Sequence, residues 1–174
     1  IQEEENTESE ENEEDEAPVV SILSDSFSDG LIDPLLWTTA GGGSVVEGDG
    51  VVTSTARGVL RSLAGYQGPF EIRVRARMNT GLEHFKIAFR SSMEEIGFGE
   101  REGLVAALSN DGSEISIQEM GPGGLGVISS KNYPLNSGQF YDLQVRDLGN
   151  RVELWIDGVR ELIAYTTFAP GSFV

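Results

Sequence analysis

The sequence predicts an all-β fold, in the form of a two-sheet antiparallel β-sandwich. Three observations lead to this expectation. After the first 17 residues, apolar and polar side chains alternate with a period of two. Glycine, asparagine, aspartate and proline fall at the breaks between these runs, and no segment has the period of an amphipathic helix. Within 174 residues, so many short strands bury their apolar faces by packing two sheets together, as in a jelly roll.

The longest expected strands show the alternation most clearly. In FEIRVRARM, residues 70–78, every second residue is apolar, and the residues between them are one glutamate and three arginines. The segment 83–91 repeats the arrangement, with Phe85, Ile87 and Phe89 on its apolar side. We expect these two apolar sets to meet in the core of the sandwich. Taken in order, the expected strands are 19–24, 44–47, 50–55, 57–62, 70–78, 83–91, 103–109, 113–119, 124–129, 139–147, 151–156 and 159–164.

The last two expected strands are joined by Asp157 and Gly158. This residue pair tolerates the positive φ angles of a type I′ turn, so VELWIDGVREL predicts a two-residue β-hairpin. Pairing outward from the turn places Trp155 opposite Arg160. An indole at this position can stack on a sugar ring or on the Arg160 guanidinium, and the sequence leaves both interpretations open. We expect the other tryptophan, Trp37, to close one end of the sandwich.

Acidic residues are concentrated at the start of the chain. Residues 1–17 hold ten of the 29 Asp and Glu residues and no Lys or Arg. Such a segment repels itself and has almost nothing to bury, which is typical of a disordered linker. We therefore expect an acidic disordered linker at 1–18 and a β-sandwich domain at 19–174, which belongs to a longer protein and is cut short at its C-terminal end.

Composition argues against several classes of function. Basic residues are in the minority, 12 against 29 acidic residues, and basic and aromatic residues do not interleave as a nucleic-acid surface requires. No apolar run approaches the length of a membrane span, so we expect no direct membrane insertion. The chain has no cysteine, which excludes disulfides and thiolate metal sites.

Two glutamates in SEISIQEM, Glu114 and Glu119, are the candidate catalytic pair. Retaining glycoside hydrolases use two carboxyl groups about 5 to 5.5 Å apart, one of which is kept protonated. In a regular strand Glu114 shares a side with Ser116, whereas Glu119 shares a side with Ile117 unless a bulge intervenes. The alternative is that both are ordinary strand residues exposed to solvent.

Basic side chains gather on the polar side of the two longest strands. Arg73, Arg75, Arg77, Lys86 and Arg90 fall on this side of an otherwise acidic chain. They either pair with carboxylates on neighbouring strands or form a surface for anionic ligands such as uronates or sulfated glycans.

Three smaller features complete the candidate sites. GPGGLG, residues 121–126, leads into VISS rather than into a helix, so we expect a glycine-rich rim beside a binding face and not a nucleotide loop. His84 is the sole histidine, which excludes a histidine-based zinc cluster and predicts an exposed strand residue. Turn aspartates Asp25, Asp29 and Asp157 can supply oxygen ligands to a structural calcium ion.

Five segments carry a family resemblance: DSFSDGLIDPLLW, VVEGDGVVTS, GVLRS, FEIRVRARM and FYDLQVRDLGNRVELWIDG. In their order along 19–164 they resemble the concanavalin A-like lectin/glucanase superfamily, especially its laminin-G-like and carbohydrate-binding jelly rolls. The resemblance implies two curved antiparallel sheets that bind sugars on the concave face or at its rim, sometimes with calcium. By resemblance to family-16-like glucanases, Glu114 and Glu119 would take the outer positions of the catalytic motif, although Ser116 stands where that motif has Asp.

These observations lead to one expected function and two alternatives. We expect a non-catalytic carbohydrate-binding or lectin-like module of a larger extracellular or cell-envelope protein. The alternatives are a family-16-like glycoside hydrolase that uses Glu114 and Glu119, and a laminin-G-like adhesion or spacer domain that binds protein. The expected ligand contacts are Trp155, Arg160, Arg73, Arg75, Arg77, Lys86 and Gln118.

Overall fold

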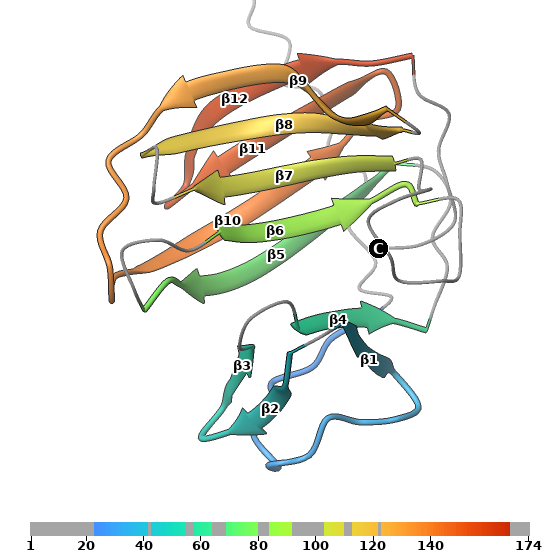
Figure 1. Ribbon diagram of the computed structural model, residues 1–174, viewed down its shortest axis with the longest axis vertical. Helices are drawn as coiled ribbons and strands as arrows, with labels where there is room; N and C mark the ends of the chain where they lie inside the picture. Colours follow the sequence, from blue (N-terminus) through green and yellow to red (C-terminus); the bar gives the residue numbers. More distant parts are fainter. Residues whose placement is uncertain are drawn as a thin grey trace, which may run out of the picture.

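The computed structural model describes residues 23–41, 43–54, 58–63, 69–79, 84–91, 103–109, 113–121 and 123–167. The predicted acidic linker at 1–18 lies outside these residues. All regular structure in the described residues is β-strand, as predicted, and most strands agree with the expected ranges to within one or two residues (Figure 1). The first strands are β1 (Trp37–Gly41), β2 (Val45–Gly48), β3 (Val51–Ser54), β4 (Gly58–Ser62), β5 (Phe70–Arg77) and β6 (His84–Phe89). They are followed by β7 (Gly103–Ser109), β8 (Glu114–Gly121), β9 (Gly124–Asn132), β10 (Phe140–Asp147), β11 (Arg151–Ile156) and β12 (Val159–Tyr165).

Two expectations at the start of the chain differ from the structure. Of the strand expected at 19–24, only Leu23 and Ser24 are described, and neither is in a strand. Strand β1 was not expected, because WTTAG does not alternate between polar and apolar residues. Trp37 begins this strand opposite Ser62 of β4, and its Nε1 donates a hydrogen bond of 2.8 Å to Asp25.

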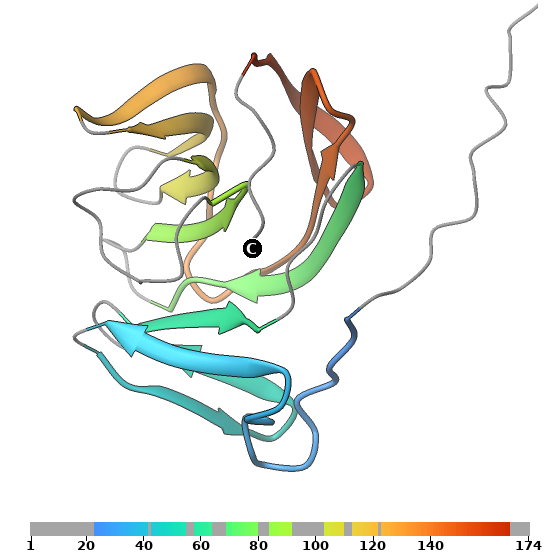
Figure 2. The ribbon, with the colours of Figure 1, turned by 90° about the vertical axis from the view of Figure 1, so that its right-hand side faces the viewer.

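Two antiparallel four-stranded sheets form the sandwich. One has the strand order β12-β11-β10-β5 and the other has the order β6-β7-β8-β9. They face each other as two layers, while the two-stranded pairs β1-β4 and β2-β3 lie together at one end of the sandwich (Figure 2). The structure therefore has the predicted two-sheet architecture.

The core lies between the two four-stranded sheets and is filled by alternate side chains of each strand. One layer contributes Phe89, Leu104, Ala106, Leu108, Ile115 and Ile117, and the other contributes Tyr141, Leu143, Val145, Val152, Leu154 and Ile156. The apolar side chains of β5 and β6 pack against this cluster, as their period of two predicted. The residues between them consequently point away from the core on both layers.

Arg90 corrects the predicted polar stripe. We expected it to point outward with Lys86, but it is only 1% exposed. The residue has a φ angle of 54°, in the left-handed region, so the alternation of β6 ends there. Its guanidinium forms an ion pair with Asp147 at the end of β10, and the two side chains are 0% and 1% exposed. Arg90 therefore links the two sheets in the interior.

The β11-β12 hairpin confirms the predicted turn and register. Asp157 and Gly158 have φ angles of 51° and 80°, as a type I′ turn requires, and Trp155 pairs with Arg160. The register then shifts, because Glu161 is an extra residue between the Trp155–Arg160 and Leu154–Leu162 pairs. Glu161 accepts a 2.5 Å hydrogen bond from Lys131 of β9, which joins the two sheets along this edge.

Candidate functional site

The seven predicted ligand contacts fall on opposite sides of the sandwich. Arg73, Arg75 and Arg77 of β5 alternate with core residues and point outward from one sheet, on the same side as Trp155 and Arg160. Lys86 and Gln118 point outward from the other sheet, opposite Ala107 and Val105. Five of the seven residues thus share one surface. We call the outward side chains of β5, β10, β11 and β12 the arginine-rich face; they include Arg73, Arg75, Arg77, Phe140, Gln144, Arg146, Arg151, Trp155 and Arg160.

The register across this sheet brings side chains from separate strands into rows. Gln144 of β10 lies between Arg73 of β5 and Trp155 of β11, and Arg160 of β12 extends the same row. Side chains directly opposite one another in antiparallel strands are close enough to contact each other. The row therefore combines three hydrogen-bonding side chains with one indole ring.

Trp155 is flanked by two guanidinium groups that come from the strands on either side of it. The Cζ atom of Arg146 lies 4.8 Å from the centroid of the indole, and the Cζ atom of Arg160 lies 5.9 Å from it. Both distances fit cation–π contacts, each of which contributes roughly 0.5 to 1 kcal/mol at an exposed site. The predicted contact with Arg160 is present, and Arg146 is a closer partner that the hairpin pattern alone did not indicate.

Glu153 holds this cluster from beneath. Its side chain is only 3% exposed, although it lies on the outward phase of β11. It accepts a 3.0 Å hydrogen bond from Trp155 Nε1 and a 3.3 Å hydrogen bond from Arg160. Arg151 Nε lies 3.2 Å from the same carboxylate, close enough for an ion pair but without the angle of a hydrogen bond. The carboxylate therefore fixes the orientation of the indole and of Arg160.

Glu71 of the edge strand β5 holds a second group of side chains on this face. It accepts hydrogen bonds from Arg73, from Gln144 at 2.5 Å and from Arg146 at 3.1 Å. Burial by itself would raise the pKa of Glu71, but the hydrogen bonds from Arg73 and Gln144 and the nearby charges of Arg73 and Arg146 outweigh it and lower that pKa. Glu71 is thus held as an anion beneath the arginines.

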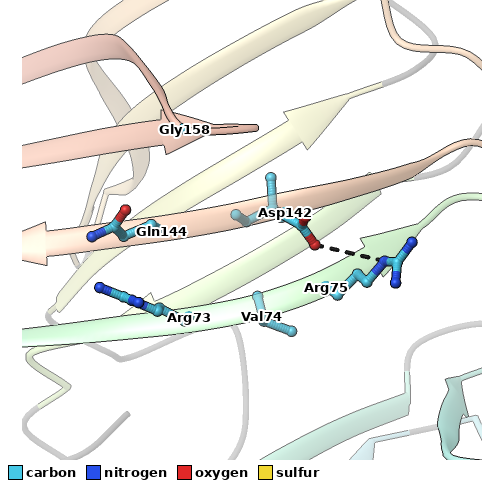
Figure 3. Close-up of a pocket in the computed structure, with 7 residues that line it drawn as sticks. Arg73, Val74, Arg75, Asp142, Gln144 and Gly158 are labelled. Atoms are coloured by element: carbon cyan, nitrogen blue, oxygen red, sulfur yellow. Dashed lines mark ion pairs between the residues drawn. The ribbon is translucent and has the colours of Figure 1, made fainter.

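A shallow depression of about 400 Å³ opens beside this network. Arg73, Arg75, Asp142, Gln144 and Gly158 line it (Figure 3). Arg75 faces Asp142 across the two strands, with a separation of 3.6 Å between the Nε and Oδ1 atoms. The depression therefore offers guanidinium, amide and carboxylate groups to a ligand on an open surface.

Phe140 provides a second aromatic ring on the same face. The Cζ atoms of Arg75 and Arg77 lie 4.9 and 4.8 Å from its centroid. Neither Phe140 nor Arg146 was among the predicted contacts, because the neighbours of a strand depend on the order of strands in the sheet. That order places β10 between β5 and β11, and the local alternation of residues does not indicate it.

The two candidate catalytic glutamates lie on opposite sides of strand β8. Residues 114–120 pair with β7 without interruption, which sets Glu114 opposite Ser109 and Glu119 opposite Leu104. Leu104 is a core residue, so Glu119 points to the core side of the sheet and Glu114 to the other side. The bulge in this region belongs to β9, where Ile128 is the extra residue. The structure therefore does not place the two carboxyl groups of the hydrolase alternative on the same side of β8.

The structure brings two of the three predicted calcium ligands together and leaves the third elsewhere: Asp25 and Asp29 both lie near Glu47, and Asp157 lies in the β11-β12 turn. Asp25 accepts hydrogen bonds from Phe27 N and Trp37 Nε1, whereas Asp157 accepts one from the backbone N–H of Asp142 in another hairpin. Among the described residues, no group of three or more His, Asp or Glu side chains is arranged to hold a metal ion. Structural calcium stays a prediction without an assembled ligand set.

Glu47 has its carboxylate near Asp25 and Asp29 in the part of the chain that precedes β5. Burial raises the pKa of Glu47, and the hydrogen bond and charge of Asp29 and the charge of Asp25 raise it further. A 2.9 Å hydrogen bond from the Gly30 backbone N–H acts in the opposite direction and is too weak to reverse the shift. This carboxyl group therefore keeps its proton to a higher pH than an exposed glutamate.

Comparisons with solved structures place this architecture among known sandwiches. It superimposes on the carbohydrate binding module CBM66 from Bacillus subtilis with a TM-score of 0.68 and 18% identity, over 79% of this chain and 84% of that chain. It also matches the catalytic domain of a laminarinase from Thermotoga petrophila, with a TM-score of 0.61 and 15% identity over 87% of this chain and 82% of that chain. The fold is a concanavalin A-like jelly roll.

Sequence comparison adds one distant relative of this jelly roll. No family model matches the chain. Over 142 residues it is 27% identical to an extracellular exo-α-L-arabinofuranosidase from Streptomyces chartreusis. The match spans 79% of this chain but only 16% of that protein. In the described ranges of the jelly roll, no helix is long and apolar enough to cross a membrane.

Proposed function

We propose that this jelly roll is a non-catalytic carbohydrate-binding module of a larger extracellular or cell-envelope protein, and that it binds glycan on the arginine-rich face. The observation that carries the proposal is the row formed by Arg73, Gln144, Trp155 and Arg160 across four strands. An indole edge and ring give apolar contact with the C–H groups of a sugar, and guanidinium and amide groups give planar hydrogen bonds to its hydroxyls.

The positions of these groups suit binding more than chemistry. Trp155 and Arg160 are held by Glu153, and Arg73 and Gln144 are held by Glu71, so the row is organised before a ligand arrives. Preorganised side chains lose less conformational entropy when a ligand binds. The depression beside them is open, so a single site should bind weakly and gain affinity when several modules act together.

The comparisons support the same proposal. The solved structures with this fold include a carbohydrate binding module and glucanases, and the curated relative is named as an extracellular glycosidase. The hydrolase alternative has less support, because Glu114 and Glu119 point to opposite sides of β8 and a retaining mechanism requires two facing carboxyl groups.

The decisive experiment compares variants on the two broad surfaces. A multivalent form of the protein is screened on a glycan array, and the glycans that bind are titrated with the wild type and with Trp155→Ala, Trp155→Phe and Gln118→Ala. We expect Trp155→Ala to weaken binding between about three- and tenfold, the range that one aromatic contact accounts for. Trp155→Phe should retain most of the affinity, and Gln118→Ala, on the other sheet, should bind like the wild type.

Three results would contradict the proposal. Loss of binding in Gln118→Ala but not in Trp155→Ala would move the site to the other sheet. Glycan cleavage by the wild type, abolished by Glu114→Gln, would restore the hydrolase alternative. No binding to any glycan by a folded multivalent form would favour the adhesion or spacer alternative, with a protein partner.

A further inference from the structure

Charge is distributed unevenly through the depth of the arginine-rich face. Two of its carboxylates are covered, since the side chain of Glu71 is 11% exposed and that of Glu153 is 3% exposed. The side chains of Arg73 and Arg75 are each 70% exposed. Solvent therefore meets mainly guanidinium groups, while two of the balancing negative charges lie underneath them.

The count of charges agrees with this arrangement. The face carries six of the chain's 12 basic side chains, Arg73, Arg75, Arg77, Arg146, Arg151 and Arg160, against Glu71, Asp142, Glu153 and, at its rim, Asp157. The chain as a whole has a formal net charge of −17. The six basic side chains outnumber the four carboxylates by two, so the face is locally positive on a chain that is acidic as a whole.

Strand β5 presents its three arginines as a regular ladder, which we call the arginine ladder: Arg73, Arg75 and Arg77. Alternate residues of a strand repeat at roughly 6.6 Å. Arg75 pairs with Asp142 at 3.6 Å, and because both side chains are largely exposed this ion pair contributes little. Within the described residues Arg77 forms no ion pair, and its contact is with the ring of Phe140.

The ring of Phe140 holds the guanidinium groups of Arg75 and Arg77 in place without neutralising their charge. The guanidiniums of Arg75 and Arg77 lie 4.9 and 4.8 Å from its centroid. A cation–π contact orients a guanidinium while leaving its N–H donors available at the edge of the plane. Those donors match the geometry of carboxylate and sulfate oxygens, which accept paired hydrogen bonds from arginine.

We infer that the arginine ladder and Phe140 form a subsite for the carboxylate or sulfate groups of an acidic polysaccharide. This inference rests on the proposed function and narrows its ligand to an anionic glycan. Trp155 contacts the sugar ring, and the arginine ladder binds the charged substituents along the polymer.

The test measures binding of the full chain to a carboxylated polymer (polygalacturonate), a sulfated polymer (carrageenan) and a neutral β-glucan. Each is measured at low ionic strength and at roughly 1 M NaCl, where the Debye length is only about 3 Å and attraction between exposed charges is largely screened. We expect acidic polymers to bind at least tenfold more tightly than the neutral one at low salt and to lose that advantage at high salt. The carboxylated and sulfated polymers separately identify which anion the subsite prefers.

Two matched variants place the effect on the ladder. Arg77→Gln removes one charge from the arginine-rich face, and Lys86→Gln removes one charge from the exposed side of the other sheet. Arg77→Gln should weaken binding to acidic polymers about tenfold, because a charge-assisted hydrogen bond is lost. It should weaken binding to a neutral glycan far less, because the row of Arg73, Gln144, Trp155 and Arg160 makes the main contacts with a neutral sugar. Lys86→Gln, on the other sheet, should leave both unchanged.

The inference and the proposed function fail in different ways. Equal binding of neutral and acidic glycans, insensitive to Arg77→Gln, would overturn the anionic subsite and leave glycan binding intact. Binding of polyphosphate or DNA as tightly as acidic glycan, with equal loss in Arg77→Gln, would also overturn it, since the face would then select any polyanion. Absence of all glycan binding would overturn the proposed function itself.

Discussion

Removal of the Asp147 carboxylate tests the buried link between the two sheets. In Asp147→Ala the guanidinium of Arg90, which is 0% exposed, loses its ion pair with Asp147. Arg90 keeps its hydrogen bond to the Gly149 carbonyl, a group without net charge. The Gly149 backbone N–H also loses its 2.9 Å hydrogen bond to Asp147 Oδ1.

The expected loss of stability follows from this burial. Removing one member of a buried ion pair destabilises proteins by about 3 to 5 kcal/mol, because it leaves an uncompensated charge in a medium of low polarity. That is a large part of a typical folding free energy of about 5 to 15 kcal/mol. With a urea m-value of about 2 kcal/mol/M, the unfolding midpoint should fall by about 2 M.

Equilibrium urea unfolding, followed by tryptophan fluorescence at neutral pH, measures the change. The control is the double variant Arg90→Leu with Asp147→Leu, which removes both charges and keeps a non-glycine residue at the left-handed position of Arg90. It should lie within about 2 kcal/mol of the wild type, since no charge stays buried. A loss below about 1 kcal/mol in Asp147→Ala would refute the reasoning, because the charge of the guanidinium would then be compensated by another group or by solvent.

Three further predictions concern pH and a turn. Because the folded-state pKa of Glu47 is raised, wild-type stability should fall as pH rises from 4.5 through that pKa, and Glu47→Gln should unfold at higher urea than the wild type at pH 7 but not near pH 4. Because the folded-state pKa of Glu71 is lowered, its contribution is present above 4.5 and lost as pH falls through the folded pKa; Glu71→Gln should therefore be less stable at pH 7 and converge with the wild type in acid. Gly158→Ala places a methyl group at a residue with φ 80°, where no atom lies within 4 Å of it, so backbone strain alone should lower the free energy of unfolding by about 1 to 2 kcal/mol in a urea titration. Gly48→Ala, which is also in open space but has no positive φ, is the control and should change that free energy little.

Strand positions and the core could be predicted because they depend on a local pattern. The period of two in β5 and β6 identifies which side chains are buried without knowledge of strand order, and Asp157-Gly158 determines a turn and thereby one register. The pairing of Trp155 with Arg160 follows from that turn alone. The sequence therefore predicts the contact of Trp155 with Arg160 but not its contact with Arg146.

The rest depends on contacts between strands that are distant in sequence or on backbone angles. Arg146 contacts Trp155, and Gln144 lies opposite Arg73, only because β10 lies between β5 and β11. The burial of Arg90 follows from its left-handed backbone angle, which the sequence does not predict for an arginine. Glu153 lies on the polar phase of its strand, and it is covered because arginines from two strands close over it.

The flanking of Trp155 by Arg146 and Arg160 also gives the protein an internal optical reporter. The chain contains two indoles, and the other, Trp37, lies on the separate β1-β4 pair with its Nε1 bound to Asp25. In Trp37→Phe, all indole emission would come from a ring whose local electric field is set by two neighbouring cations. Any molecule that draws either guanidinium away from the ring would shift that emission, so occupancy can be followed in unlabelled protein.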